Sequence, residues 1–227
     1  LLKTVTTAFK GGWTTIKLYF MIGLPTETLE DIAGIAELGQ KVVDTFYNNP
    51  DKPRGKSVKV TVSASSFVPK PFTPFQWEPQ DTIEMLQKKQ RHLVSSVKTR
   101  KIQANWHDAD TSFLEAVFAR GDRRLCDVLL EAHKSGCKMD GWQAFFSLPK
   151  WIEIFKKCNV DPAFYANRRR SFDEILPWDH IDYGIKKSFL INECKKAYEN
   201  VTTPNCREKC SSCGAACFKG GICSEKR

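Results

Sequence analysis

The carboxyl-terminal part of the 227-residue chain contains a dense group of cysteines, namely Cys206, Cys210, Cys213, Cys217 and Cys223. Thiolates two to four residues apart can bend around one metal centre, whereas two cysteines that close together form a disulfide only in a tight loop. The spacing therefore predicts a metal site with Cys206, Cys210, Cys213 and Cys217 as ligands. Such a site holds either zinc or an iron–sulfur cluster, and the spacing alone does not separate the two.

The other cysteines are isolated from one another in apolar or helical stretches, at Cys126, Cys137, Cys158 and Cys194. Unpaired thiols of this kind are typical of a reducing cytosol, so we expect a cytoplasmic protein. The chain has no run of about eighteen apolar residues. This excludes a membrane-spanning helix, and we expect no membrane partner.

The charge balance is basic, with 35 lysines and arginines against 26 acidic residues and a net charge of +9. Such a balance favours anionic partners without requiring one. Arginines cluster at Arg120, at residues 123–124 and at residues 168–170, but acidic residues separate the clusters, which favours solvated helix faces. The alternative is that these arginines contact phosphates. RNA is then a candidate partner of a basic zinc-knuckle module without catalytic activity.

The first half of the chain alternates strand and helix patterns. Residues 15–22 predict a strand, and Tyr19 and Met21 make its second face apolar, which is typical of a parallel strand buried on both sides. A helix that Thr28 caps follows. A second strand over residues 58–65, a helix over about residues 80–98 and a short strand over residues 102–106 complete the pattern. This order predicts parallel α/β packing.

From Asp108 onward the pattern is helical, with apolar positions at helical spacing near residues 114–118, 125–132, 151–155 and 181–198. The first ten residues resemble the end of an amphipathic helix that closes on two glycines. Because the chain starts with leucine, we expect a fragment that lacks its natural amino-terminal part.

Several segments carry a resemblance to one enzyme superfamily. Residues 12–28, which include Gly23-Leu24-Pro25-Thr26-Glu27, closely resemble a late barrel strand and turn of radical S-adenosylmethionine (SAM) proteins, and residues 63–77 resemble the next strand and loop. Residues 119–124, residues 176–182 and the cysteine tail resemble a subgroup of uncharacterised bacterial radical SAM proteins with an amino-terminal cobalamin-binding-like domain. The resemblance covers essentially the whole chain.

The resemblance implies an α/β fold: the C-terminal part of a partial (βα) radical SAM barrel over residues 1–107, an α-helical extension over residues 108–200 and a Cys-rich metal-binding tail over residues 201–227. The intact protein would use SAM and a [4Fe-4S] cluster to generate a 5′-deoxyadenosyl radical, and cobalamin would belong to its amino-terminal part.

In the family, the three-cysteine loop that holds the cluster follows the first barrel strand, so the tail resembles this signature at the wrong end of the chain. We expect the tail to hold an auxiliary iron–sulfur cluster or zinc. We also expect this piece to be inactive alone, with its catalytic ligands elsewhere. The resemblance indicates no substrate and no oligomeric state.

Four residues are candidates for cofactor binding at the barrel mouth. A glycine at the carboxyl end of a parallel strand, here Gly23, lets the backbone approach a ligand, and Pro25 fixes the turn into the next helix. A turn that merely needs Gly and Pro explains the same two residues. Ser63 and Ser65 either face a polar ligand inside the barrel or lie on the less packed face of their strand.

Three other residues, His107, His180 and Asp122, are candidates for a role. His107, at the end of the last strand, is the stronger candidate for a site by location. His180 would act as an acid or base if Asp179 oriented its ring, although a histidine that caps a helix is the simpler interpretation. Asp122 is expected to pair with a neighbouring arginine, either Arg120 or Arg123.

Overall fold

The computed structural model describes residues 1–53 and 55–215. The chain divides into two compact units. The first unit comprises Leu1–Phe67 and Asp81–Phe113, and the second comprises Val68–Gln80 and the chain from Leu114 onward. The segment after the second strand therefore belongs with the helical part of the chain. In the residues that the structure describes, no helix is long and apolar enough to cross a membrane.

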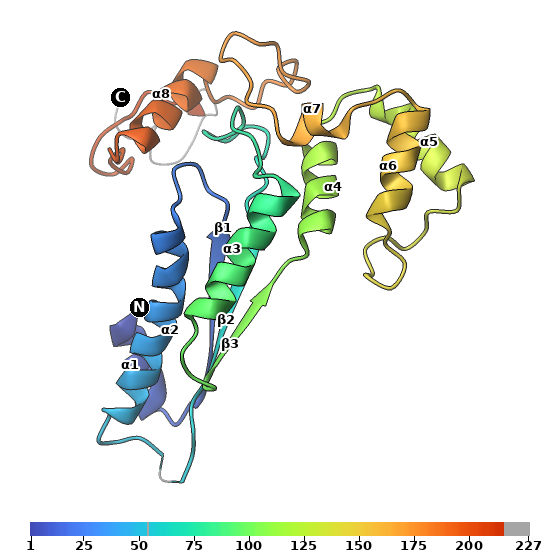
Figure 1. Cartoon of the computed structure of the whole chain (residues 1–227). Coiled ribbons are helices and arrows are strands. Elements are labelled where there is room, and N and C mark those ends of the chain that lie inside the picture. The colour runs from blue at the N-terminus through green and yellow to red at the C-terminus, as the bar shows by residue number, and fades with distance from the viewer. Residues whose placement is uncertain (54, 216–227) are drawn as a thin grey trace. The chain divides into compact units, whose positions relative to one another are not determined.

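The first unit is built on a parallel three-stranded sheet with the strand order β1-β2-β3 (Figure 1). Helix α2 connects the first two strands and helix α3 connects the last two. The bounds are β1 (Thr15–Ile22), α2 (Leu29–Tyr47), β2 (Lys59–Ser66), α3 (Ile83–Ser96) and β3 (Ile102–Trp106). These elements confirm the strand and helix pattern that the sequence predicts.

Both connecting helices cover the same face of the sheet. Helix α2 contacts all three strands, and α3 packs against α2 and β3, as Figure 1 also shows. This arrangement buries alternate strand residues in one apolar core, which includes Leu18, Ile22, Val60, Val62 and Ile102 from the sheet and Ile32, Val42 and Phe46 from α2. Burial of this apolar surface is the main stabilising contribution to the unit.

The opposite face of the sheet carries the other alternate residues and is more open. The Tyr19 and Met21 side chains on this face are 74% and 45% exposed. The prediction that both faces of this strand are buried was therefore wrong. The reason is topological, because α2 and α3 both lie on the other face and leave the Tyr19 side uncovered.

The amino-terminal helix α1 (Leu2–Lys10) packs against α2. Its Phe9 ring is fully buried and meets the Phe46 ring edge to face, with ring centroids 5.1 Å apart. The helix closes on Gly11, and Gly12 adopts a positive φ of +89°, as the sequence predicts.

The start of α2 also follows the prediction. Thr28 is the N-cap, and its hydroxyl accepts a hydrogen bond from Asp31 N, while the Asp31 carboxylate accepts one from Thr28 N. This reciprocal pair is a capping box, in which side chains satisfy two backbone donors that lack helical partners.

The second unit is formed by short helices and long connecting segments. Helix α4 starts just before the division of the chain. The helices are α4 (Ala109–Ala119), α5 (Leu125–Lys134), α6 (Leu148–Lys157), α7 (Pro162–Ala166) and α8 (Lys187–Tyr198). A small apolar cluster of Trp77, Leu176, Trp178 and Leu190 packs loop segments against α8. The sequence pattern predicted a helix that begins at Ile181, but α8 begins six residues later. Helix α7 was not predicted.

Candidate functional site

The predicted glycine turn lies at the carboxyl end of β1. Gly23 is buried with a φ of +85°, and its N–H donates a 2.7 Å hydrogen bond to Glu27 Oε2. A Cβ at this position would lie 3.1 Å from Leu86 Cδ2 and 3.3 Å from Asp81 Oδ2. The positive φ and the close packing both favour glycine. Pro25, which is partly buried, occupies the same turn.

A buried ion cluster supports this turn. The Lys89 ammonium lies 2.9 Å from Glu27 Oε2 and 2.8 Å from Asp81 Oδ2, and the Lys89 and Glu27 side chains are only 7% and 8% exposed. Burial alone would lower the pKa of Lys89, but the hydrogen bonds with Asp81 and Glu27 outweigh it and raise that pKa. Lys89 therefore stays protonated and fixes the carboxylate that holds Gly23.

Lys89 was not predicted as part of a site, although its position in the sequence offered a signal. Lys89 is three residues after Leu86 and four before Leu93, so it lies on the apolar stripe of α3. A charged residue on such a stripe requires a buried partner. The carboxylates of Glu27 and Asp81 are those partners.

The two predicted serines lie on the open face of β2, where both are half-buried. Ser65 pairs with Met21 of β1, near the Gly23 end of the strands, and its hydroxyl donates a 3.2 Å hydrogen bond to Phe20 O. Ser63 pairs with Tyr19 on one side and Asn105 on the other. The structure thus brings Gly23, Pro25 and Ser65 to the carboxyl end of the sheet, and Ser63 lies two residues before Ser65, farther from that end.

The carboxyl end of β3 contributes polar groups as well. His107 N donates to Ala64 O at 3.1 Å, and the Gln90 amide donates to His107 O at 2.9 Å. Asp108 accepts a hydrogen bond from Thr111 N at the start of α4. Burial, together with the charges of Asp108 and Glu84, raises the pKa of Asp110. The end of the sheet therefore carries an exposed histidine and a carboxyl group that retains its proton more readily than usual.

The predicted metal ligands of the tail follow helix α8. Cys213 O accepts a 2.8 Å hydrogen bond from Lys186 N at the start of α8, and Thr203 donates a 2.6 Å hydrogen bond to Glu193 Oε1. Between these contacts lie Cys206 and Cys210. The tail is thus attached to two places along the helix.

The thiols suit zinc or an iron–sulfur cluster by their chemistry. Within residues 1–53 and 55–215, however, no group of three or more His, Cys, Asp and Glu side chains is arranged to hold a metal ion. Cys206, Cys210 and Cys213 are therefore not gathered into such a group, and Cys217 lies outside the described residues. The metal site stays a prediction from spacing.

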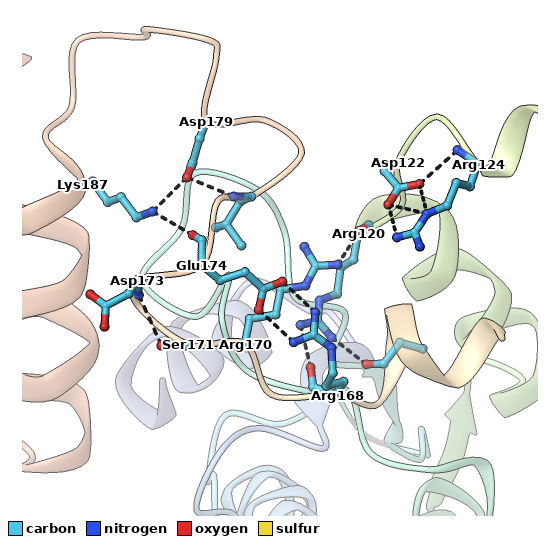
Figure 2. A network of polar contacts seen from close by, with 12 residues as sticks. Arg120, Asp122, Arg124, Arg168, Arg170, Ser171, Asp173, Glu174, Asp179 and Lys187 are labelled. Carbon is cyan, nitrogen blue, oxygen red and sulfur yellow. Dashed lines mark hydrogen bonds and ion pairs between the residues drawn. The ribbon is translucent and has the colours of Figure 1, made fainter. Parts of the chain in front are cut away.

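The consecutive arginines at positions 168 to 170 each have a different partner in the second unit, and Figure 2 shows the contacts of Arg168 and Arg170. Arg168 makes a bidentate pair with Glu174, at 2.8 and 2.7 Å. Arg169 pairs with Glu78 at 2.7 Å, and Arg170 donates to Arg120 O. This cluster is not a solvated helix face as the sequence suggested, because it links the segment from Arg168 to Glu174 with the segments around Glu78 and Arg120.

Arg120 is the most buried member of this arginine network. Its side chain is completely inaccessible, and its guanidinium donates to Ala166 O at 2.7 Å and to Arg168 O at 2.9 Å. Burial, followed by the charges of Arg170 and Arg168, lowers the pKa of Arg120 to about 9. The acceptors are 46 and 48 residues away in the sequence, so no local signal identified them.

A second polar cluster surrounds the buried Glu78 carboxylate. Besides Arg169, it includes Cys194 and Tyr198 of α8, with the Cys194 Sγ 3.8 Å from Glu78 Oε1. Burial, followed by the charge of Glu78, raises the pKa of Cys194 to about 11. Burial and a hydrogen bond with Glu78 raise the pKa of Tyr198 to about 12. Both groups are therefore neutral at physiological pH and anchor α8.

Two pairings expected from the sequence have different partners. Asp122 forms its ion pair with Arg124, at 2.6 Å, and also accepts a hydrogen bond from the Tyr165 hydroxyl. Asp179 accepts hydrogen bonds from Leu176 N and the Lys187 ammonium. The contacts of Asp179 thus hold its own loop, and the exposed His180 gains no support as an acid or base.

Comparison with known proteins gives one informative match. An uncharacterised protein of Methanocaldococcus jannaschii is 32% identical over 122 residues, which make up 54% of this chain and 24% of that protein. The matched part is thus a minor share of the archaeal relative. No protein-family model matches the chain, and no solved structure matches it.

Proposed function

We propose that the chain is the C-terminal part of a radical SAM iron–sulfur enzyme. The observation that supports this most is the sheet of the first unit, in which three parallel strands follow one another in order and both connecting helices cover one face. A (βα) barrel repeats this arrangement and leaves the opposite face of the sheet inside the barrel. One half of a doubly wound sheet has the same three-stranded arrangement, so the choice of a barrel also depends on the character of the open face.

The open face of the sheet has the composition that a barrel interior with a ligand requires. Ser63, Ser65 and Asn105 supply hydrogen-bonding groups beside the exposed Tyr19 and Met21. Barrel ligands bind at the carboxyl ends of the strands, which is where the Gly23 turn lies. Under the proposal, the backbone at this turn and the two serine hydroxyls contact SAM, and Lys89 keeps the turn in place.

The chemistry would belong to the longer protein of which the chain is a part. SAM bound to a [4Fe-4S] cluster supplies a 5′-deoxyadenosyl radical in enzymes of this class. The tail with Cys206, Cys210, Cys213 and Cys217 would hold a separate group, either an auxiliary iron–sulfur cluster or zinc.

The test uses the intact protein, purified without oxygen, with iron and sulfide quantified. We expect SAM to bind and 5′-deoxyadenosine to form when a reductant is added. Ser63→Ala and Ser65→Ala should weaken SAM binding several-fold, whereas Ser57→Ala, before β2, should not. Intact protein with a full iron content that binds no SAM would contradict the proposal.

The tail requires its own measurement. Cys210→Ala and Cys213→Ala should each remove one class of metal from the protein while SAM binding persists. Loss of iron and sulfide with visible absorption indicates an auxiliary cluster, and loss of zinc indicates a structural knuckle. Unchanged metal content in both variants would contradict a metal site in the tail.

The RNA-binding alternative stays a prediction. It relied on arginines as phosphate contacts, but Arg120 and Arg170 are buried and Arg168 is paired with Glu174. RNA binding would have to depend on other cations, so we do not propose it as a second function.

A further inference from the structure

Arg120 and Arg170 of the second unit are buried cations that bind backbone carbonyl groups. Arg120 is 0% exposed and Arg170 is 4% exposed. In the described part of the chain, the hydrogen bonds of the two guanidiniums go to Ala166 O, Arg168 O and Arg120 O. A carbonyl group is a good acceptor but carries no net charge. The two positive charges are therefore not neutralised by their direct partners.

The nearby carboxylates are already paired with other arginines, and Figure 2 shows the pairs of Glu174 and Asp122. Glu174 binds Arg168, Glu78 binds Arg169 and Asp122 binds Arg124. Among the described residues of this network, five guanidiniums thus accompany three carboxylates that pair with arginine, which leaves an excess of two positive charges. The pair of Lys187 with Asp179 does not change this balance.

Several guanidinium N–H groups of this network also lack a hydrogen-bond acceptor in the part of the chain that the structure describes. Arg120 Nε, Arg168 Nε and both Nε and Nη1 of Arg170 are buried and have no hydrogen-bond acceptor among the described residues. Burial of an unpaired guanidinium donor costs more than burial of a neutral one, because hydrogen bonds to charged groups are stronger. One face of Arg170 is occupied by the Trp178 ring, 5.3 Å away, so an acceptor would approach the edge of the guanidinium.

We propose that the second unit folds around a small oxyanion, a carboxylate or an inorganic phosphate, which accepts hydrogen bonds from Arg170 and Arg120. Such an anion supplies both the negative charge and the acceptors that the buried guanidiniums lack, and planar guanidinium groups suit oxyanions. Because the Arg170 nitrogens are screened from solvent, the anion is enclosed as the segment from Arg168 to Glu174 folds. Its binding is then linked to the stability of the folded chain.

The experiment measures the thermal unfolding midpoint of the 227-residue chain at constant ionic strength and pH. Phosphate or acetate replaces chloride stepwise, so the two oxyanion sources are compared directly. We expect the midpoint to rise and saturate with one of them, by about 5 °C or more at a hundredfold excess over the dissociation constant. A midpoint that is the same in all three salts would overturn the proposal.

Variants separate specific binding from a general salt effect. Arg170→Met keeps much of the packing against Trp178 but should abolish the saturable shift, and Arg170→Lys should reduce it several-fold. Arg124→Gln, an exposed arginine of the same network, should retain the full shift. If Arg170→Met does not fold, Arg170→Lys carries the test. A full shift in a folded Arg170 variant would overturn the proposal, because the effect would then not depend on this guanidinium.

Discussion

The two units of this chain are stabilised by different kinds of contact. In the first unit, two helices on one face of a parallel sheet enclose a continuous apolar core, and Lys89 is a buried charge with carboxylate partners on two sides. In the second unit, short helices and long segments are joined by arginines that reach distant backbone carbonyls and carboxylates. Apolar packing leaves a periodic pattern in the sequence, whereas long-range arginine contacts leave none.

The largest effect that this comparison predicts concerns the core of the first unit. Phe46 is fully buried against Phe9, and Phe46→Ala should lower the free energy of unfolding by about 3–5 kcal/mol, because it removes apolar contacts and leaves a cavity. Hydrogen exchange followed by peptide mass spectrometry would assign the loss to a unit. Tyr47→Ala, which removes a partly exposed ring at the next position, is the control and should cost much less. Equal losses of protection in both units would contradict two separately stabilised units.

Local signals explain why the first unit was predictable. The Thr28 cap, the glycines after α1 and the strand at residues 15–22 depend on neighbours in the sequence, and all were predicted. The exposure of Tyr19 was not predicted, because an apolar strand residue looks the same in the sequence whether or not a helix covers it. The helix placement is a property of the topology.

The candidate site was predictable only in part. Gly23, Pro25 and Ser65 lie together at the end of the sheet because parallel strands align their carboxyl ends. The Glu27, Lys89 and Asp81 cluster that holds the turn needs one helix and two connecting segments to meet, which the spacing within one element does not reveal. The cysteine spacing predicts ligands, but how the thiols are arranged depends on contacts of α8 with the tail.

The next effect tests whether arginine contacts hold the second unit together. Arg120→Ala should lower the free energy of unfolding by about 2–4 kcal/mol, because Arg168 O loses its guanidinium donor, Ala166 O keeps only the donor Gln80 N, and a cavity remains. Arg124→Ala removes an exposed arginine from the same network and should cost less than about 1 kcal/mol. Chemical denaturation combined with hydrogen exchange should place the larger loss in the second unit. Similar losses for the two variants would show that burial of the guanidinium is unimportant.

A smaller effect is expected at the turn of the candidate site. Gly23→Ala introduces a side chain at a positive φ and within 3.1 Å of Leu86, which should cost about 1–2 kcal/mol. Gly34→Ala is a matched control in α2, where a Cβ meets open space, and it should stabilise the helix by up to about 1 kcal/mol. Thermal unfolding of both variants gives the comparison. A neutral Gly23→Ala would mean that the turn can relax, and would weaken its assignment as a rigid ligand-binding turn.

The smallest predicted effect is a pH dependence of the free energy of unfolding that differs between the two units. The hydrogen bond from Arg124, opposed by burial and assisted by further hydrogen bonds, lowers the pKa of Asp122 to about 2 from its ordinary 3.8. The resulting stability is present above pH 3.8 and is lost as the pH falls through about 2, by about 1 kcal/mol after solvent screening. Lys89 of the first unit behaves in the opposite way, since its raised pKa gives a stability that is present below pH 10.5 and is lost only in more alkaline solution.

The pH dependence can be measured by urea unfolding of the wild type and Asp122→Asn between pH 2 and 6. The difference in free energy between them should be constant above about pH 5 and shrink toward pH 2, because the wild-type carboxylate then takes up a proton. Tyr165→Phe, which removes a weaker hydrogen bond to the same carboxylate, should reproduce a small part of the change. Lys89→Met should leave the acid limb unchanged. If it abolished the acid dependence instead, the acid-sensitive carboxylate would belong to the first unit, and the contrast between the two units would fail on this point.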